Sequence, residues 1–315
     1  MSRIKRFLFL TGALGLMASI NSYIFANTPK MKCFPETDEK YYDWKEGDVF
    51  YKVKGEGKKI LLLHGIYFGA SSFEWRKNFL PLAEKFKVYS IDLIGFGKSA
   101  KIRRGYRSNL YVKLIFEFID EIIRDECYIV ATSLTCNYAI RTAILYQKLV
   151  KGLFLIGPLL TYKRTGNFEL MELLYYQLLG TPVIGTSIYN IMTSKAFIRN
   201  FLEGQIYSNS DLVTRELVNH YYMLSHQKGS EYFFPSLMTG LLELNVKEDL
   251  RNLPQSIFVL LGKKLDVPPS RIVKEMKNLN PKIKFNIFEN SKLFPHDEQS
   301  EEFNKFIIQS TGEKK

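Results

Sequence analysis

The sequence predicts an α/β protein built on a mainly parallel, doubly wound sheet with an inserted helical lid. Two patterns support this fold class. Short apolar runs of strand length alternate with stretches of helical period, as in proteins whose parallel sheet carries helices on both faces. The strand-like runs then stop between about Leu160 and Leu253, where helical patterns take over. With 315 residues, 46% of them hydrophobic, the chain can bury a sizeable core, which excludes a disordered protein or a small disulfide scaffold.

The first 26 residues predict a membrane anchor. Three basic residues lie among the first six, and Phe7 to Ala26 then runs without a charge. At about 1.5 Å per helical residue this stretch matches the roughly 30 Å of a bilayer core. The short basic start favours an extracytoplasmic body. A cleaved signal peptide, which would release a secreted protein, remains the alternative, although the end of the stretch matches a cleavage site poorly.

The rest of the chain is expected to form a polar tether and a folded body. Residues 27–47 are polar, contain two prolines and predict the tether. Residues 48–159 and 254–310 predict the body, and residues 160–253 the helical lid. Strands are expected at Val49 to Val53, Lys59 to Leu63, Val88 to Leu93, Cys127 to Ala131, Gly152 to Ile156, Ser256 to Leu261 and Ile283 to Phe288. Helices are expected around Val112 to Ile122, Phe168 to Leu179 and Asp211 to Ser225.

The net charge and the cysteine content limit the classes of partner and cofactor that we expect. Lysine and arginine number 44 against 32 acidic residues, and the net charge of +12 favours anionic partners such as acidic lipid headgroups. The sequence lacks the alternation of aromatic and basic residues that would indicate nucleic-acid binding. The three cysteines form no even set and have no metal-ligand spacing with the four histidines, and no G-x-G-x-x-G follows a strand. We therefore expect no metal and no cofactor.

Three stretches at the ends of successive strands carry a family resemblance. They are Leu61 to Gly69 with its His-Gly turn, Val88 to Ser99 with Asp-x-x-Gly-x-Gly-x-Ser, and Ile129 to Tyr138 with Ala-x-Ser at a strand-to-helix turn. From about Val49 to Ser310 the chain resembles the α/β-hydrolase family. The resemblance implies that Ser133 is the nucleophile and that the backbone amides of Ile66 and Leu134 form an oxyanion hole. Taken alone, Ser133 also fits a helix N-cap.

The remaining family positions depart from the pattern. Thr135 stands where the sharp turn favours a tiny side chain. The acid position falls on Leu265, so Asp266 comes one residue late, and the base position falls on Leu293. His296 lies three residues further on. It is the candidate base, although its spacing alone favours a loop histidine that caps the last helix.

These departures leave two functions open. The first is a serine hydrolase that cleaves an apolar acyl ester, thioester or amide through an acyl-enzyme on Ser133, with His296 as base and Asp266 as orienting acid. The second is a catalytically silent binding or scaffolding protein. In either case the aromatic and methionine-rich lid indicates an apolar, lipid-like ligand. If the last loop follows the family's course, Leu293 faces Ser133 and His296 points towards the lid or solvent.

Overall fold

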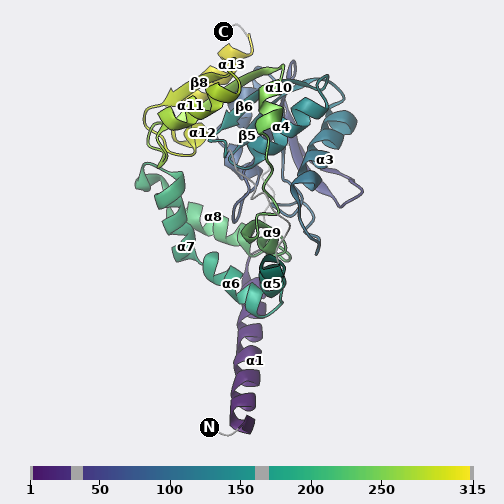
Figure 1. The fold of residues 1–315 in the computed structure, drawn as a ribbon, viewed down its shortest axis with the longest axis vertical. Coiled ribbons are helices and arrows are strands. Elements are labelled where there is room, and N and C mark those ends of the chain that lie inside the picture. The colour runs from purple at the N-terminus through teal and green to yellow at the C-terminus, as the bar shows by residue number, and fades with distance from the viewer. Residues whose placement is uncertain (1–2, 30–37, 160–169, 313–315) are drawn as a thin grey trace.

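The strands of the described residues form one eight-stranded sheet, which lies within the body in the upper part of Figure 1. The computed structural model describes residues 3–29, 38–159 and 170–312. The strand order is β1-β2-β4-β3-β5-β6-β7-β8. The strands are β1 (Asp38–Tyr42), β2 (Val49–Lys54), β3 (Lys59–Leu63), β4 (Lys87–Ile91), β5 (Cys127–Thr132), β6 (Val150–Ile156), β7 (Ser256–Gly262) and β8 (Lys284–Phe288).

The sheet is parallel from β4 to β8, while β2 pairs antiparallel with both β1 and β4. Its central strands are buried on both faces, which explains their continuous apolar sequences. In β3, for example, Leu61 and Leu63 pack into one hydrophobic cluster, whereas Ile60 and Leu62 pack into the cluster on the opposite face. Alternating side chains of one strand thus stabilise two helix layers.

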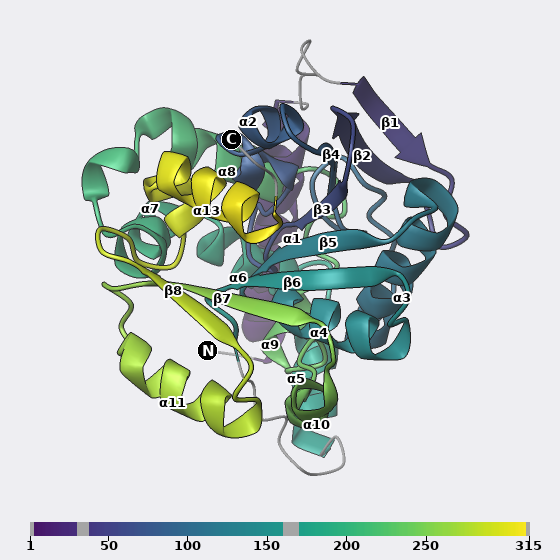
Figure 2. The ribbon, with the colours of Figure 1, turned by 90° about the horizontal axis from the view of Figure 1, so that it is seen from above.

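Helices cover both faces of this sheet (Figure 2). The first face carries α3 (Ser108–Phe118), continued by the π-helical turn η2 (Ile119–Ile123), together with α4 (Thr135–Leu145), α10 (Lys247–Asn252) and α11 (Pro269–Leu279). The second face carries the 3₁₀ turn η1 (Ser72–Trp75), α2 (Phe79–Ala83), α12 (Pro295–Glu298) and α13 (Ser300–Ser310). The predicted doubly wound α/β architecture is confirmed.

Between β6 and β7 the chain leaves the sheet and forms the lid. In its described part, from residue 170 to 240, there are helices and no strands: α5 (Leu170–Leu179), α6 (Ile184–Met192), α7 (Lys195–Phe201), η3 (Leu202–Ile206), η4 (Ser210–Leu212), α8 (Arg215–Ser225) and α9 (Phe234–Met238). The start of the predicted lid, including Phe168, lies outside the described residues. The ring of Tyr221 in α8 lies 6.1 Å from that of Tyr67, just past the end of β3. This contact places the lid over the carboxyl ends of the strands.

Helix α1 (Arg3–Asn27) extends away from the body at the lid end of the molecule (Figure 1). The predicted anchor from Phe7 to Ala26 is therefore helical. No helix in the described parts of the chain is both long enough and apolar enough to cross a membrane. The C-terminal half of α1 is fastened to the lid by Asn21, whose amide donates to the Val183 carbonyl at 3.1 Å and whose oxygen accepts from Asn190 at 2.9 Å.

Two predicted boundaries are corrected by the structure. Residues 27–47 were expected to be a tether throughout, but Asp38–Tyr42 forms the edge strand β1, paired with β2. One edge and much of one face of this strand meet water, so polar residues are tolerated there. Its sequence, DEKYY, is therefore too polar to indicate a strand. The lid was expected to reach residue 253, yet α10 packs on α4 and α11 and buries Leu250 in the core of the body. Residues 30–37 of the predicted tether, with Cys33, lie outside the described residues.

Candidate active site

Ser133 lies at the sharp turn between β5 and α4, where the sequence predicted a nucleophile. Its φ is +53°, in the left-handed region that serine rarely adopts. The Ser133 amide donates to the Ile156 carbonyl at 2.9 Å, and its carbonyl accepts from the Cys136 amide at 3.2 Å. The backbone bonds hold the turn in this strained conformation, and the side chain remains partly exposed.

The turn that contains Ile66 follows β3 and is braced by His64. The His64 ring is fully buried, accepts at Nε2 from the Leu93 amide at 2.9 Å and contacts the Gly65 carbonyl through Nδ1 at 2.7 Å. Burial lowers the pKa of His64, so the ring stays neutral, as an acceptor at Nε2 requires. This histidine therefore connects the β3 and β4 turns and is not available to transfer protons to Ser133.

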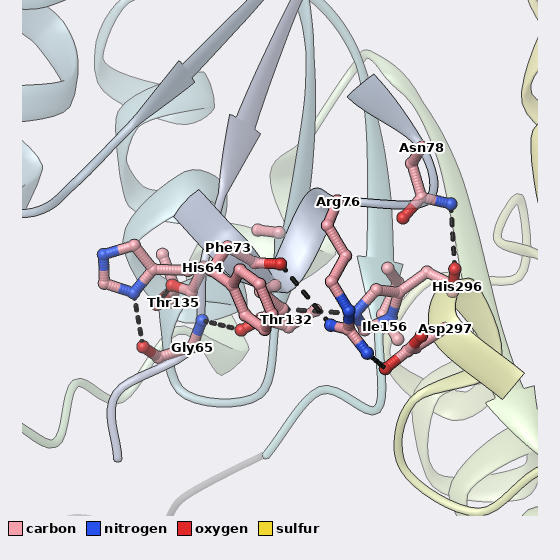
Figure 3. Close-up of polar contacts among 12 residues, drawn as sticks. His64, Gly65, Phe73, Arg76, Asn78, Thr132, Thr135, Ile156, His296 and Asp297 are labelled. Carbon is pink, nitrogen blue, oxygen red and sulfur yellow. Dashed lines mark hydrogen bonds and ion pairs between the residues drawn. The ribbon is translucent and has the colours of Figure 1, made fainter. Parts of the chain in front are cut away.

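Thr135 has a structural role that its family position did not indicate. Its hydroxyl donates to the His64 carbonyl at 2.8 Å, and the side chain is fully buried (Figure 3). The bond ties the first turn of α4 to the turn after β3, on which Ile66 lies. Both predicted oxyanion residues, Ile66 and Leu134, thus follow strand ends that are joined by hydrogen bonds.

The loop after β4 owes its shape to Asp92. This buried carboxylate accepts from the Ser72 amide at 2.6 Å and from the Lys98 amide at 2.7 Å. Gly97 has φ +50°, and a Cβ there would lie 2.0 Å from Asp92 Oδ2. Glycine is required because the carboxylate occupies the space of a side chain. This motif thus positions the loop and supplies no reactive group.

Leu293, at the predicted base position, lies beside the end of β6. Gly157 directly follows the Ile156 carbonyl that holds Ser133, and a Cβ on Gly157 would lie 2.5 Å from Leu293 Cδ1. The Leu293 amide donates to the Ile206 carbonyl of η3 at 3.1 Å, which fixes the loop against the lid. The side chain that this loop places near the Ser133 turn, which we call the elbow, is therefore an isobutyl group. An isobutyl group has no lone pair to accept a proton.

His296 is completely buried and faces neither the lid nor solvent. The expectation of an outward ring was wrong because the ring packs among aromatic side chains, with centroids 4.7 Å from Trp75 and 4.7 Å from Phe294. Neither ring nitrogen has a hydrogen-bond partner. Burial lowers the pKa of His296 to about 3. Across the described residues, no hydrogen bond joins a histidine to Ser133.

Glu74 is the polar neighbour of His296 and was not singled out from the sequence. It is buried in η1, accepts from the Thr132 hydroxyl at 2.6 Å and from the Gly65 amide at 3.0 Å, and also accepts from the Tyr67 hydroxyl. Burial raises the pKa of Glu74 to about 7 against these hydrogen bonds. His296 Nε2 lies 3.5 Å from Glu74 Oε1. With these pKa values both side chains are neutral between about pH 3 and pH 7, so we interpret the contact as a neutral one.

Asp297 forms a buried charged cluster next to His296. Its side chain is 1% exposed and forms an ion pair with Arg76 (Figure 3) and a second one with Lys77, both of which follow η1. The Tyr207 hydroxyl, from the lid, also donates to Asp297. Burial would raise the pKa of Asp297, but Arg76 and the bond from Tyr207 outweigh it and keep the pKa below its usual value. The cluster joins lid and body.

Asp266, the predicted orienting acid, lies at the surface. Its side chain is 59% exposed and pairs with Lys292, with Nζ 2.7 Å from Oδ1. The preceding Leu265 is partly buried and packs against the core. The structure thus brings Ser133 and Leu293 to the end of β6 but places His296 in an aromatic cluster and Asp266 in a surface ion pair. No group of metal-ligating side chains occurs in the described ranges.

Comparison with known proteins identifies the family model that this chain matches. Residues 60–306 match the model described as alpha/beta hydrolase family. A 2-hydroxy-6-oxo-6-(2'-aminophenyl)hexa-2,4-dienoic acid hydrolase from Metapseudomonas resinovorans is 31% identical over 34% of this chain and 38% of its own length. Haloalkane dehalogenase 2 from Mycobacterium tuberculosis is 30% identical over 30% of this chain and 32% of its length. The alignments thus span about a third of these curated relatives.

Solved structures resemble the fold over most of the chain. A serine hydrolase involved in carbazole degradation superposes with a TM-score of 0.72 at 18% identity, covering 88% of this chain and all of its own. A bacterial membrane phospholipase A gives a TM-score of 0.69 at 18% identity, covering 97% and 96%. At these identities the likeness describes the fold.

Proposed function

The chain belongs to the alpha/beta hydrolase family, and from that premise we propose that it is a membrane-attached, catalytically silent member that binds an apolar acyl-type ligand. The observation that carries the proposal is the burial of His296. Among the described residues, the histidine nearest in sequence to the expected base position, His296, is fully buried with both nitrogens unpartnered, and Leu293 occupies the position itself. A serine hydroxyl is a weak nucleophile at neutral pH unless a base accepts its proton.

Electrostatics support the same conclusion. A general base works best when its pKa lies near the operating pH. The pKa of His296 is lowered to about 3, first by burial, so the imidazole is a weak proton acceptor at pH 7. Protonation would place an imidazolium among Trp75 and Phe294 with neither nitrogen hydrogen-bonded, and with Glu74 Oε1 3.5 Å away from Nε2. To act on Ser133, the ring would have to leave this aromatic cluster.

The proposed ligand class follows from the inner side of the lid. Phe68, after the oxyanion turn, contacts a cluster of aromatic rings with centroids 5.7 to 6.1 Å away, contributed by Tyr189, Phe233 and Phe234. A ligand between lid and body would meet mainly these apolar surfaces. An acyl chain or a similar lipid-like group fits them better than a sugar or a phosphate.

Membrane attachment through α1 is the second part of the proposal. Phe7, Phe9 and Leu16 are each more than 60% exposed on a helix that extends from the body. Exposure of large apolar side chains on this scale is unfavourable in water. We therefore assign α1 to insertion into a lipid bilayer.

One observation favours the alternative, a serine hydrolase that acts on apolar acyl esters, thioesters or amides. Ser133 keeps a positive φ, a strain that a purely structural serine does not need. In that function His296 would be the base and would have to reach Ser133 after a rearrangement of the last loop. Asp266 would have to exchange its ion pair with Lys292 for the imidazole.

Labelling of the full-length protein with a fluorophosphonate probe separates the two functions. We expect no labelling of the unmodified protein above that of Ser133→Ala. The double variant Leu265→Asp with Leu293→His restores both family positions and should label at Ser133. Adding Ser133→Ala to it should abolish that signal, which controls for other reactive groups. Rapid labelling of the unmodified protein that His296→Phe abolishes would establish the hydrolase and refute the silent function.

A further inference from the structure

Helix α5 is apolar apart from Glu172 and Gln177, and most of its side chains are exposed. Leu170 and Met171 are each 71% exposed and Leu174 is 55% exposed. Leu173, Tyr175 and Leu178 are exposed as well, and in α5 only Leu179 is buried. Surface helices of soluble domains present a polar face to water, and a large exposed apolar patch marks an interaction site.

Helix α1 presents a second exposed apolar surface at the same end of the molecule. Both α1 and α5 pack against α6, and α1 leaves the body next to α5 and α6 (Figure 1). The buried Asn21 side chain fixes α1 to this part of the lid through the Val183 carbonyl and Asn190. The exposed side chains of the two helices therefore belong to one end of the protein, which we call the lid end.

We infer that the lid end docks on a phospholipid bilayer, with α5 embedded in the membrane interface beside the inserted α1. The inference deepens the membrane attachment proposed above and is independent of whether Ser133 is active. The distribution of apolar residues favours lipid over a second protein. Phe7 and Phe9 lie about 200° apart around α1, as do Leu14 and Leu16, and all four are exposed. A partner protein covers one side of a helix, whereas lipid surrounds it.

A cavity between α1 and α5 supplies polar groups for the lipid headgroups. It has a volume of about 460 Å³ and is lined by Asn21 of α1, Tyr176 of α5, and Arg103 and Arg104 of the loop after β4. Arg104 is paired with Glu46, while Arg103 is exposed. Glu231 also lines the cavity; burial raises its pKa, and nearby Arg103 opposes that rise. Guanidinium groups are suited to phosphate oxygens, so an anionic phospholipid fits this position.

Site-specific fluorescence tests whether α5 contacts lipid. Cys127 and Cys136 are buried, so in full-length protein with Cys33→Ser a cysteine at an exposed position can be labelled selectively. An environment-sensitive dye is attached through Leu174→Cys, and a matched control uses Leu145→Cys, 59% exposed at the end of α4 on the body. With vesicles of phosphatidylcholine and phosphatidylglycerol in equal parts, we expect a blue shift at position 174 and none at 145.

The possible results separate this inference from the attachment through α1. Protein that floats with the vesicles while the dye at position 174 keeps its solvent spectrum would overturn the docking of α5 and leave α1 attachment standing. Protein that does not float would overturn both. A blue shift without vesicles, accompanied by a dimer in size-exclusion chromatography, would show that a second copy covers α5 and would also overturn the inference.

Substitutions in α5 and the cavity give a second, quantitative test. Leu170→Ser, Met171→Ser and Leu174→Ser combined should lower partitioning into vesicles about tenfold or more, because three apolar side chains are withdrawn from the interface. The combined Leu145→Ser and Ile287→Ser control should not change it. Arg103→Gln should weaken binding to the phosphatidylglycerol vesicles and leave binding to pure phosphatidylcholine unchanged. Unchanged partitioning of the α5 variant would overturn the inference.

Discussion

The buried imidazole of His296 makes the stability of the protein depend on pH in a way that one substitution removes. Its pKa is about 3 in the folded protein and 6.5 in an unfolded chain, with burial the main cause. Below pH 6.5 the unfolded chain binds a proton that the folded protein does not. The free energy of unfolding therefore falls as the pH falls from 6.5 towards 3.

The magnitude follows from the linkage. Each pH unit below 6.5 costs about 1.4 kcal/mol, so at pH 5 His296 reduces stability by about 2 kcal/mol relative to pH 8. Phenylalanine has a similar shape and suits the surroundings of Trp75, Phe294 and Phe303. The difference in the free energy of unfolding between His296→Phe and the unmodified protein should thus shift by about 2 kcal/mol in favour of the variant when the pH is lowered from 8 to 5. Any constant packing difference cancels in this comparison.

Urea unfolding at a series of pH values measures the effect, monitored by tryptophan fluorescence. Glu74, whose pKa is about 7, also titrates in this range, but its contribution cancels in the difference because its contact with His296 is a neutral one. The reasoning is refuted if the unmodified protein gains stability relative to His296→Phe as the pH falls. That result would mean that an imidazolium forms and pairs with the Glu74 carboxylate across their 3.5 Å contact.

Three further predictions concern the elbow, the charged cluster and α1. Ser133→Gly should be about 1 kcal/mol more stable than Ser133→Ala in chemical denaturation, because glycine relieves the positive φ and alanine does not; equal stabilities would show that the turn is unstrained. Asp297→Asn should cost about 3 kcal/mol by leaving the half-buried Arg76 uncompensated, and Tyr207→Phe about 1 kcal/mol, both measured by thermal unfolding; the reverse order would contradict the cluster. Asn21→Ala should speed hydrogen exchange in α1, because three hydrogen bonds to the lid, with Val183, Ser187 and Asn190, are lost; unchanged exchange would show that Asn21 does not hold the helix.

The main sheet could be predicted from the sequence because its strands are buried on both faces. Continuous apolar runs predicted Lys59 to Leu63 with both bounds correct, and the other six expected strands to within two residues. Strand β1 was missed for the opposite reason. Asp38–Tyr42 lies at the sheet edge and owes its conformation to pairing with β2, which its own polar residues do not indicate.

The sequence could predict the position of a site residue only where the local conformation of the chain determines that position. The sequence placed Ser133 at a strand-to-helix turn, because an Ala-x-Ser pattern after an apolar strand is typical of that turn. The surroundings of His296 depend on Trp75 and Glu74, more than 200 residues earlier in the chain, and no local spacing reveals such a contact. Glu74 itself lies in the run Ser-Ser-Phe-Glu-Trp, which gives no sign that its carboxyl is buried.

The insertion of the lid between neighbouring strands has a consequence for synthesis on the ribosome. β6 ends at Ile156, and its parallel neighbour β7 begins only at Ser256. At about 5–20 residues per second the ribosome takes roughly 5–20 s to deliver that neighbour. During this delay the nascent chain carries an open edge at Val150–Ile156, a template for pairing with other chains. Polypeptides released after the lid but before β7 should therefore aggregate, whereas completion of β7 closes the edge.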